Sequence, residues 1–384
     1  MPGADPERWF GASQLAQASA LHRSLAQVRT CRALADAAVL VLFLALGLAE
    51  HLVRPYPQAL WTDRVLVVFV ALEAAALPHR LLAGAREQWL LADGVAEGAE
   101  RTGEPGLGRL VVGPIASAVV RLVLGGLLLL CISAVARATP WWPVVVSVVL
   151  AVVSMAAAVL YPFVVAPVVD RVVRVNDPEV LARIGELARR AGLGCPTVLA
   201  AVGGPIGDEG AYVAGFGRAR RLVIAADVVR GPTADLDVVV AHELGHWKLG
   251  HHRRATTAWL AAAAAALAFL ALADLLVRTL AAGGDFDRLD PRLLPLWMVL
   301  AVGAGAVSHL VLCAVSRSHE RDADAFAVGL LGDGRHLAAH LRRVMVQAGS
   351  DLAPSRWRAL SRDHPPPAER LADLLAPPKE PRDA

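Results

Sequence analysis

Six long apolar stretches constrain the fold of this chain more than any other feature. Hydrophobic residues make up 56% of its 384 positions and charged residues only 19%, and the mean hydropathy is +0.49, as in membrane proteins. A helix needs about 20 apolar residues to cross roughly 30 Å of hydrocarbon. The stretches that approach or exceed this length are Leu34–Leu52, Arg64–Pro78, Val111–Ala136, Trp141–Val169, Thr256–Leu280 and Leu293–Val315. We therefore predict a mainly α-helical, polytopic membrane protein with about six spans.

Arginines near the ends of the stretches predict the orientation of the chain. Arg23, Arg29 and Arg32 precede the first stretch, and positive side chains concentrate on the cytoplasmic side of a membrane. We expect a multi-pass protein of a bacterial-type plasma membrane, with its N-terminus, its long insert and its C-terminus in the cytoplasm. The predicted organisation is a four-span region at 1–169, a cytoplasmic segment at 170–255, two further spans at 256–315 and a cytoplasmic segment at 316–384. The net charge of +3 gives no reason to expect a nucleic-acid partner.

The two cytoplasmic segments carry helical and strand signals. A helix is predicted at Pro178–Ala191. Short β-rich runs follow at 197–202, 211–217 and 221–229. The last two runs are typical of a hairpin, so a small sheet is expected. A helix of about four turns should then begin after a Thr233 cap and stop at Gly250. In the tail we predict helices at 317–331 and 335–348.

The sequence "AHELGHW" on the helix before Gly250 has the spacing of a zinc hydrolase. His242 and His246 are four residues apart, so their imidazoles project from one helix face and can bind one zinc ion at about 2.0–2.1 Å. Glu243 lies about 100° around the helix, where it can reach a metal-bound water without acting as a ligand. Zinc lowers the pKa of such a water to about 7. Glu243 can then take its proton during attack on a peptide carbonyl and return it to the leaving amine.

A zinc site needs a third protein ligand, and two candidates are open. His252 lies six residues after His246, where a metzincin has its third histidine, but that pattern needs a glycine where this chain has leucine. The alternative is Glu320 in "SRSHERDADAFA". Asp324, one turn further on the same face, can accept a hydrogen bond from a ligand imidazole. Arg317, on the other side of Glu320, can pair with either acid.

Three segments together resemble the integral-membrane zinc metallopeptidases of the CAAX prenyl protease and HtpX kind. They are "AHELGHWKLGH", "SRSHERDADAFA" and "HPPPAERLADL". The segment "AYVAGFGRARRLVIAADVV" is similar to the substrate-side segment of that family, and the resemblance covers residues 170–375. It implies one Zn²⁺ ion on His242, His246 and Glu320, with Glu243 as the base and Asp324 in support.

The resemblance also implies roles for the Pro-rich tail motif. His364 and Arg370 would lie near the zinc ion. An imidazole there can stabilise the oxyanion of the tetrahedral intermediate, whereas Arg370 would brace the site through an acid. His251, His252 and His319 would then be solvent-facing or interfacial residues.

Gly210 departs from the pattern of the family. The family usually has asparagine before the "AYV" triplet, where its side chain can bond to the substrate backbone, and this chain has glycine. Backbone groups along Ala211–Gly215 can still bind an extended peptide as an added strand. The predicted substrate-binding residues are therefore Gly210, Ala211, Tyr212 and Val213.

The expected function is that of a membrane-embedded zinc metalloendopeptidase. Its predicted partners are the lipid bilayer and peptide or membrane-protein substrates, because the spans restrict substrates to chains in or near the bilayer. Two functions fit this placement: proteolytic removal of lipid-modified C-terminal residues, and degradation of damaged membrane proteins. The alternatives are a metal-handling transporter, which would usually have its ligands near mid-membrane, and a catalytically inactive membrane scaffold.

Overall fold

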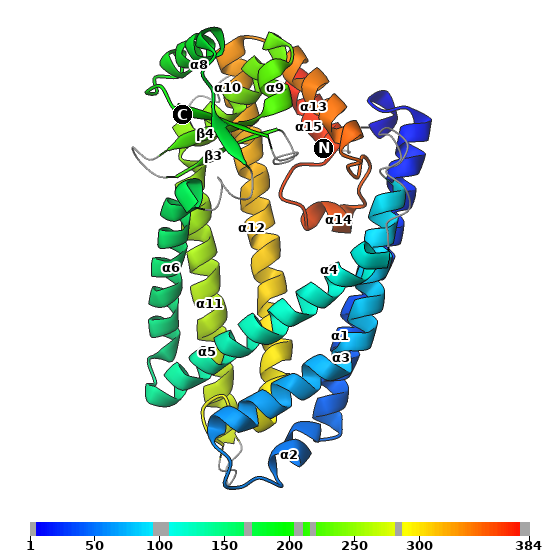
Figure 1. The fold of residues 1–384 in the computed structure, drawn as a ribbon, viewed down its shortest axis with the longest axis vertical. Helices are drawn as coiled ribbons and strands as arrows, with labels where there is room; N and C mark the ends of the chain where they lie inside the picture. The colour runs from blue at the N-terminus through cyan, green and yellow to red at the C-terminus, as the bar shows by residue number, and fades with distance from the viewer. Residues whose placement is uncertain are drawn as a thin grey trace. The chain divides into compact units, whose positions relative to one another are not determined.

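The computed structural model of the protein describes residues 5–94, 107–164, 171–202, 210–215, 220–280 and 286–376, and these are mostly helical (Figure 1). The chain forms two compact units. The first comprises Met1–Ser19, Ala151–Trp259 and Leu310–Ala384, and the second comprises Ala20–Leu150 and Leu260–His309. The predicted mainly α-helical class with a small sheet is confirmed.

Long apolar helices account for most of the predicted spans. The helices before the sheet are α1 (Ala12–Ala45), α2 (Leu48–Val53), α3 (Trp61–Gly94), α4 (Leu107–Val120), the π-helical turn η2 (Arg121–Gly125), α5 (Gly126–Ala138) and α6 (Trp142–Val164). In the described part of the chain, four helices are long and apolar enough to cross a membrane: Trp61–Ala92, Val111–Ala138, His251–Leu280 and Pro291–Leu331. A shorter apolar helix covers Trp142–Ala157.

The first predicted span differs from the expectation of one continuous helix. Helix α1 ends at Ala45, and α2 begins at Leu48 after Gly47, whose φ is 60°. This left-handed conformation breaks the helix inside the apolar stretch. The number of spans and the four-segment organisation stay predictions.

Charged side chains within the second unit have defined partners. The Arg80 guanidinium donates from Nη1 to Glu73 Oε1 at 2.7 Å and from Nε to Asp36 Oδ1 at 2.7 Å. Asp274, which is 1% exposed, accepts a hydrogen bond from the backbone N–H of Leu289 at 2.9 Å. These bonds compensate charges that are costly in an apolar surrounding.

A four-stranded sheet lies in the first unit. Its strands are β1 (Val172–Arg174), β2 (Thr197–Ala201), β3 (Ala211–Ala214) and β4 (Arg221–Ala225), in the order β1-β2-β4-β3. Strands β3 and β4 pair antiparallel with Ala211 opposite Ile224, which confirms the predicted hairpin. Strand β4 is shorter than predicted, because the chain turns into helix α9 (Ala226–Arg230) where a strand to residue 229 was expected. Asp227 in the first turn of α9 suits a helix start.

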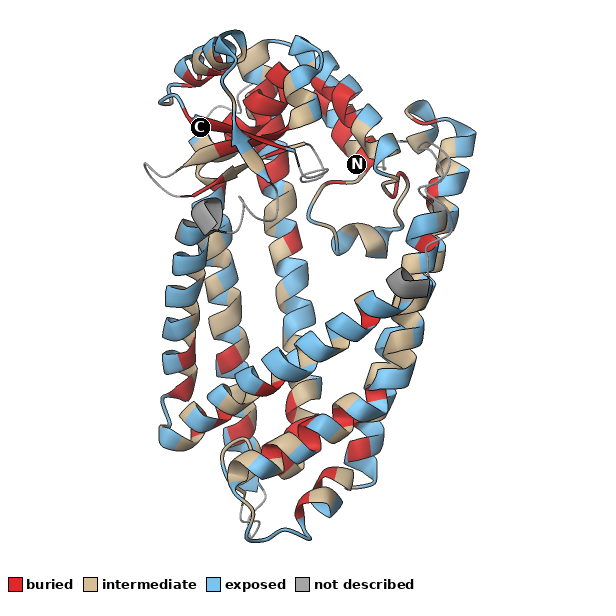
Figure 2. Cartoon of the chain, in the orientation of Figure 1, coloured by how far each residue is buried: buried red, intermediate tan, exposed pale blue. Residues whose placement is uncertain are grey.

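Further helices after β1 carry most of the predicted site residues. They are α8 (Pro178–Arg190), α10 (Thr233–Leu249), α11 (His251–Leu280), α12 (Leu294–Leu331), α13 (Arg335–Gln347), α14 (Arg356–Leu360) and α15 (Pro367–Leu375). Helix α10 contacts β3 and α13. Figure 2 shows that buried residues gather in α10 and the sheet, whereas few described residues of α6 and α11 are buried.

Three helix boundaries refine the sequence predictions. The cap of α10 is Pro232, so Thr233 is its first helical residue and not its cap. The predicted stop at Gly250 is confirmed, because this residue caps α10 with a φ of 68°. The predicted apolar helix at 293–315 and tail helix at 317–331 form one 38-residue helix, α12. No glycine or proline stands between Val315 and Arg317 to interrupt it.

Candidate metal centre

Helix α10 is buried along most of its length, and this places polar side chains inside the first unit. Every residue from Leu236 to Gly245 is buried, including His242 at 2% exposure and Glu243 at 7%. Among the α10 residues, Leu236, Val238, Val239, Val240 and Leu244 belong to the main hydrophobic core of this unit. Buried imidazole and carboxylate groups need partners, so the surroundings of His242 and Glu243 carry information about function.

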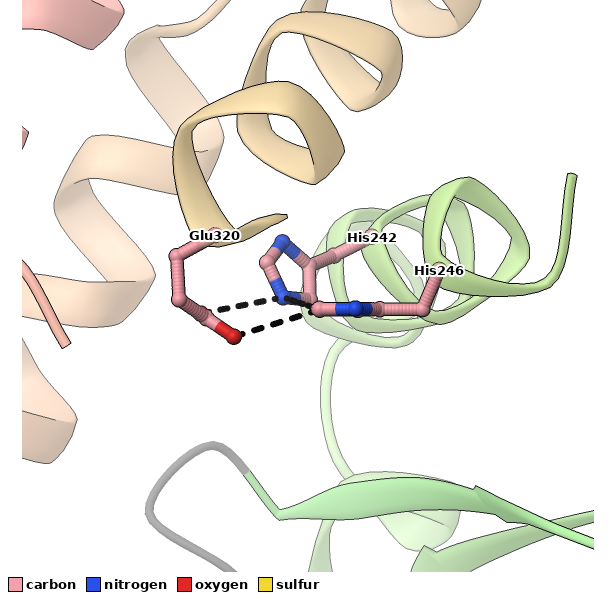
Figure 3. Close-up of side chains that lie close together, drawn as sticks. All are labelled: His242, His246 and Glu320. Atoms are coloured by element: carbon pink, nitrogen blue, oxygen red, sulfur yellow. Dashed lines mark hydrogen bonds and ion pairs between the residues drawn. The ribbon is translucent and has the colours of Figure 1, made fainter. Parts of the chain in front are cut away.

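His242, His246 and Glu320 converge on one point (Figure 3). The two Nε2 atoms lie 3.0 Å apart, His246 Nε2 lies 3.3 Å from Glu320 Oε1, and His242 Nε2 lies 3.6 Å from Glu320 Oε2. Ligand atoms at about 2.0–2.1 Å around a tetrahedral zinc are about 3.3 Å from one another. The spacing of the three side chains and their nitrogen and oxygen chemistry therefore fit a zinc ion.

A second acid and an arginine lie behind the three side chains. Asp324 Oδ1 is 3.0 Å from His242 Nδ1, the ring nitrogen that points away from the other ligand atoms. Arg370 donates to both Asp324 oxygens at 2.7 and 2.8 Å, and its Nη2 lies 3.2 Å from Glu320 Oε2. One guanidinium thus faces two carboxylates that are each less than 10% exposed. Without this opposite charge the two acids would repel each other at short range.

The tail also brings His364 to the centre. Its Nδ1 lies 3.0 Å from Glu320 Oε2. Arg317 differs from the expected pairing with an acid, because its guanidinium donates to backbone carbonyls of the segment before His364, including Leu360 O at 2.9 Å. Its side chain leaves α12 toward this segment, so Arg317 anchors the part of the tail that carries His364.

Exposure is uneven around the centre. The side chains of His242 and Glu320 are 3% and 8% exposed, whereas those of His246 and His364 are 22% and 30% exposed. Water or a substrate can therefore approach the centre on the side of His246 and His364. The opposite side is closed by Asp324 and Arg370.

The close approach of α10 and α12 depends on Gly245. A β-carbon on Gly245 would lie 3.1 Å from both the Cα and the carbonyl oxygen of Ala323. Ala323 stands between Glu320 and Asp324 on α12, so a larger residue at position 245 would separate the histidines from both acids. The sequence signal for this close approach is the glycine inside "HELGH", which the HExxH spacing leaves without a predicted role.

We expect Gly245→Ala to cost about 1–3 kcal/mol of unfolding free energy, because an extra methyl in a packed contact forces the backbone to shift. The variant should also bind zinc more weakly than the parent chain. Thermal unfolding and chelator competition measure the two effects. Gly329→Ala on α12 is the matched control, because no atom beyond the adjacent backbone of its own helix lies within 4 Å of its added β-carbon. Equal behaviour of the two variants would contradict the role given to Gly245.

Strand β3 forms an edge of the described sheet, with β4 on its inner side. Ala211 and Ala214 are buried, and Tyr212 and Val213 are partly exposed. Gly210, the expected asparagine position, has a φ of 81°, and a β-carbon there would lie 3.0 Å from Val228 Cγ2. A side chain at this position would be strained, so the glycine suits the local backbone.

Two histidines expected at a solvent or interfacial position are buried. His251 is 2% exposed and His319 is 9% exposed. Their rings stack with centroids 4.3 Å apart, and His251 also contacts His246. The expectation for His252 agrees with the structure, which exposes this residue. The sequence does not predict that His251 faces inward, because residues five apart, such as His246 and His251, do not lie on one face of a helix.

Comparison with known proteins gives an independent view of the chain. The family model described as peptidase family M48 matches residues 175–377. CAAX prenyl protease 1 homologues are similar to part of the chain. The protein from Arabidopsis thaliana is 29% identical over 231 residues, which cover 57% of this chain and 53% of that protein. The protein from Taenia solium is 26% identical over 258 residues, which cover 59% and 54%. The chain spans about half the length of these curated relatives.

A solved structure has a similar fold. The crystal structure of S. mikatae Ste24p aligns with a TM-score of 0.73, covering 97% of this chain and 91% of that one. The sequence identity of this pair is 18%, so the likeness concerns the fold alone.

Proposed function

The chain belongs to peptidase family M48, and from this we propose that it is an integral-membrane zinc metalloendopeptidase. The observation that carries the proposal is the convergence of His242 and His246 from α10 with Glu320 from α12, all within 4.8 Å of one another. These three residues would hold one zinc ion. When bound, zinc supplies Lewis acidity toward a water molecule and a peptide carbonyl.

The residues around the ligands take the roles that their chemistry allows. Glu243 acts as general base, taking a proton from the attacking water and giving it to the leaving amine. His364 faces the accessible side and stabilises negative charge on the carbonyl oxygen during attack. Asp324 accepts a hydrogen bond from the Nδ1–H group of His242 and keeps that imidazole in one tautomer. Arg370 balances the charge of Asp324 and Glu320, and Arg317 positions the tail segment that ends in His364.

An extended peptide is the substrate form that suits the sheet. The outer edge of β3 can pair with a peptide backbone through Ala211, Tyr212 and Val213, with Gly210 at its start. Backbone pairing with β3 does not depend on the side chains of the peptide, so this edge supports the proposal of an endopeptidase that accepts many substrate sequences. The apolar helices tether the site, so the proposed substrates are membrane-associated proteins, either misfolded or carrying modified C-termini. The chain is similar to relatives named CAAX prenyl protease 1 homologues, and this similarity favours proteins with modified C-termini as one class of substrate. We further propose that the site faces the cytoplasm.

The test compares the wild-type chain with Glu243→Gln in detergent, using an unstructured reporter peptide and bound zinc measured in both. We expect equal zinc content and a turnover about 10²–10⁴-fold lower in the variant, because glutamine cannot accept the proton. Glu186→Gln, which removes an exposed acid from α8, should leave both readouts unchanged. Undiminished cleavage by Glu243→Gln would refute the assignment of the base. Metal flux through liposomes that contain the wild-type chain, without peptide cleavage, would favour a transporter.

A further inference from the structure

His251 contacts the proposed zinc ligand His246 at the ring nitrogen that does not face the other ligands, and the proposed catalytic steps give His251 no role. Its Nδ1 lies 3.1 Å from His246 Nδ1. The two rings meet edge to face, with centroids 5.0 Å apart and an interplanar angle of 79°. Because His251 is only 2% exposed, water competes little for this contact, and a polar contact shielded from water is stronger than an exposed one.

Proton positions decide which ring donates. His246 Nε2 faces His242 Nε2 at 3.0 Å and Glu320 Oε1 at 3.3 Å, so it is the ligating atom. A neutral imidazole that ligates through Nε2 carries its hydrogen on Nδ1. The His246 Nδ1–H group therefore donates, and His251 Nδ1 accepts.

Helix α12 holds His251 in the accepting state. The His319 ring stacks on the His251 ring at a centroid distance of 4.3 Å and an angle of 11°. On the far side, Asp322 Oδ2 lies 3.9 Å from His251 Nε2. A carboxylate there favours the tautomer with the hydrogen on Nε2, and this tautomer has its lone pair on Nδ1.

Gly250 makes the contact possible. Its φ of 68° ends α10 and starts α11 at the next residue. This change of chain direction brings His251 back to His246, although five residues separate them. A residue with a β-carbon is strained in that conformation, so the contact depends on glycine at position 250.

We propose that His251 is a positioning residue that fixes the ring orientation and tautomer of the zinc ligand His246. It does for His246 what Asp324 does for His242, whose Nδ1 is 3.0 Å from Asp324 Oδ1. A neutral imidazole adds no further negative charge to a centre that already contains Glu243, Glu320 and Asp324. This inference rests on the proposed zinc site.

Two amide variants separate positioning from packing. The amide of Asn reaches the position of a histidine Nδ1, whereas the longer Gln places its amide near the position of Nε2. We expect His251→Asn to keep the zinc dissociation constant within about threefold, and His251→Gln to raise it about 10–100-fold, the usual effect of losing an outer partner of a ligand. Competition with a chromophoric chelator on the full chain in detergent measures both constants. His252→Gln, one position further and exposed, should match the wild type.

The outcomes distinguish this inference from the proposed function. Wild-type zinc affinity in His251→Gln would overturn the positioning role, and equal losses in His251→Asn and His251→Gln would reduce His251 to a packing residue. The effect of His251→Gln should disappear in a His246→Ala background, because His251 acts through that ring. If His246→Ala itself binds zinc as tightly as the wild type, the zinc site fails and this inference fails with it.

Discussion

Replacement of Glu320 by glutamine should weaken zinc binding roughly 10³-fold and reduce peptide hydrolysis to background. Structural zinc sites gain about 10–16 kcal/mol from binding, so one of three protein ligands accounts for about 3–5 kcal/mol. The carboxylate also supplies the only formal negative charge among the three ligands. Glutamine keeps the shape of the side chain but offers a neutral carbonyl oxygen, which zinc prefers less than a carboxylate, imidazole or thiolate.

The fold should tolerate this change. Arg370 keeps its two bonds to Asp324 at 2.7 and 2.8 Å after Glu320 loses its charge. Equilibrium chelator competition gives the zinc affinity, and thermal unfolding of the metal-free chain shows whether the fold persists. Glu369→Gln on α15 is the matched control, because that acid is 44% exposed.

His252→Gln settles the competition between the two candidates for the third ligand. The sequence leaves His252 and Glu320 open, and the structure exposes His252 while Glu320 is 6% exposed and faces both histidines. Zinc affinity should therefore survive in His252→Gln. Loss of zinc in that variant, with normal affinity in Glu320→Gln, would exchange the roles of the two residues and remove the basis of the proposed centre.

Features set by local periodicity were predictable from the sequence. The spacing of His242 and His246 defines one face of a helix, and Gly250 ends that helix as expected. The β3–β4 hairpin follows from two short β-rich runs. Long apolar stretches predict helices directly, although Gly47 shows that a single left-handed residue interrupts one of them.

Features that depend on contacts between distant segments were less predictable. The direction of Arg317 depends on carbonyl groups in a tail segment that is far away in the sequence. His251 faces inward because the chain turns at Gly250 and because His319 comes from another helix. The tight crossing at Gly245 becomes visible only when Ala323 of α12 lies against it. A motif therefore predicts the candidate ligands, whereas packing decides which groups hold those side chains in place.

Arg370→Met should destabilise the metal-free chain by about 3–5 kcal/mol, the usual cost of removing one partner from a buried ion pair. Arg370 is 2% exposed, and Asp324 and Glu320 are 5% and 6% exposed. Methionine has nearly the same length as the arginine stem, so packing is largely kept and the lost charge dominates the effect. The two acids would then either take up protons or admit water.

Zinc affinity should fall in the same variant. A protonated Asp324 accepts a weaker hydrogen bond from the Nδ1–H group of His242. Glu320 also loses the guanidinium nitrogen that lies 3.2 Å from its Oε2, so both side chains are less well oriented for zinc. Arg189→Met is the control, because its partner Glu186 is 50% exposed and such surface pairs contribute about 0–1 kcal/mol. Urea unfolding of the metal-free proteins compares the two losses.

Addition of zinc provides the decisive comparison for Arg370. Because zinc affinity falls in Arg370→Met, the same concentration of zinc should add less stability to this variant than to the wild type, by an amount set by the ratio of the two dissociation constants. A ligand raises stability according to its concentration relative to its dissociation constant, and the comparison therefore uses zinc well above the weakened constant of the variant. If Arg370→Met unfolds like Arg189→Met with and without zinc, the guanidinium does not balance the acids of the centre, and its contacts with Asp324 and Glu320 are energetically minor.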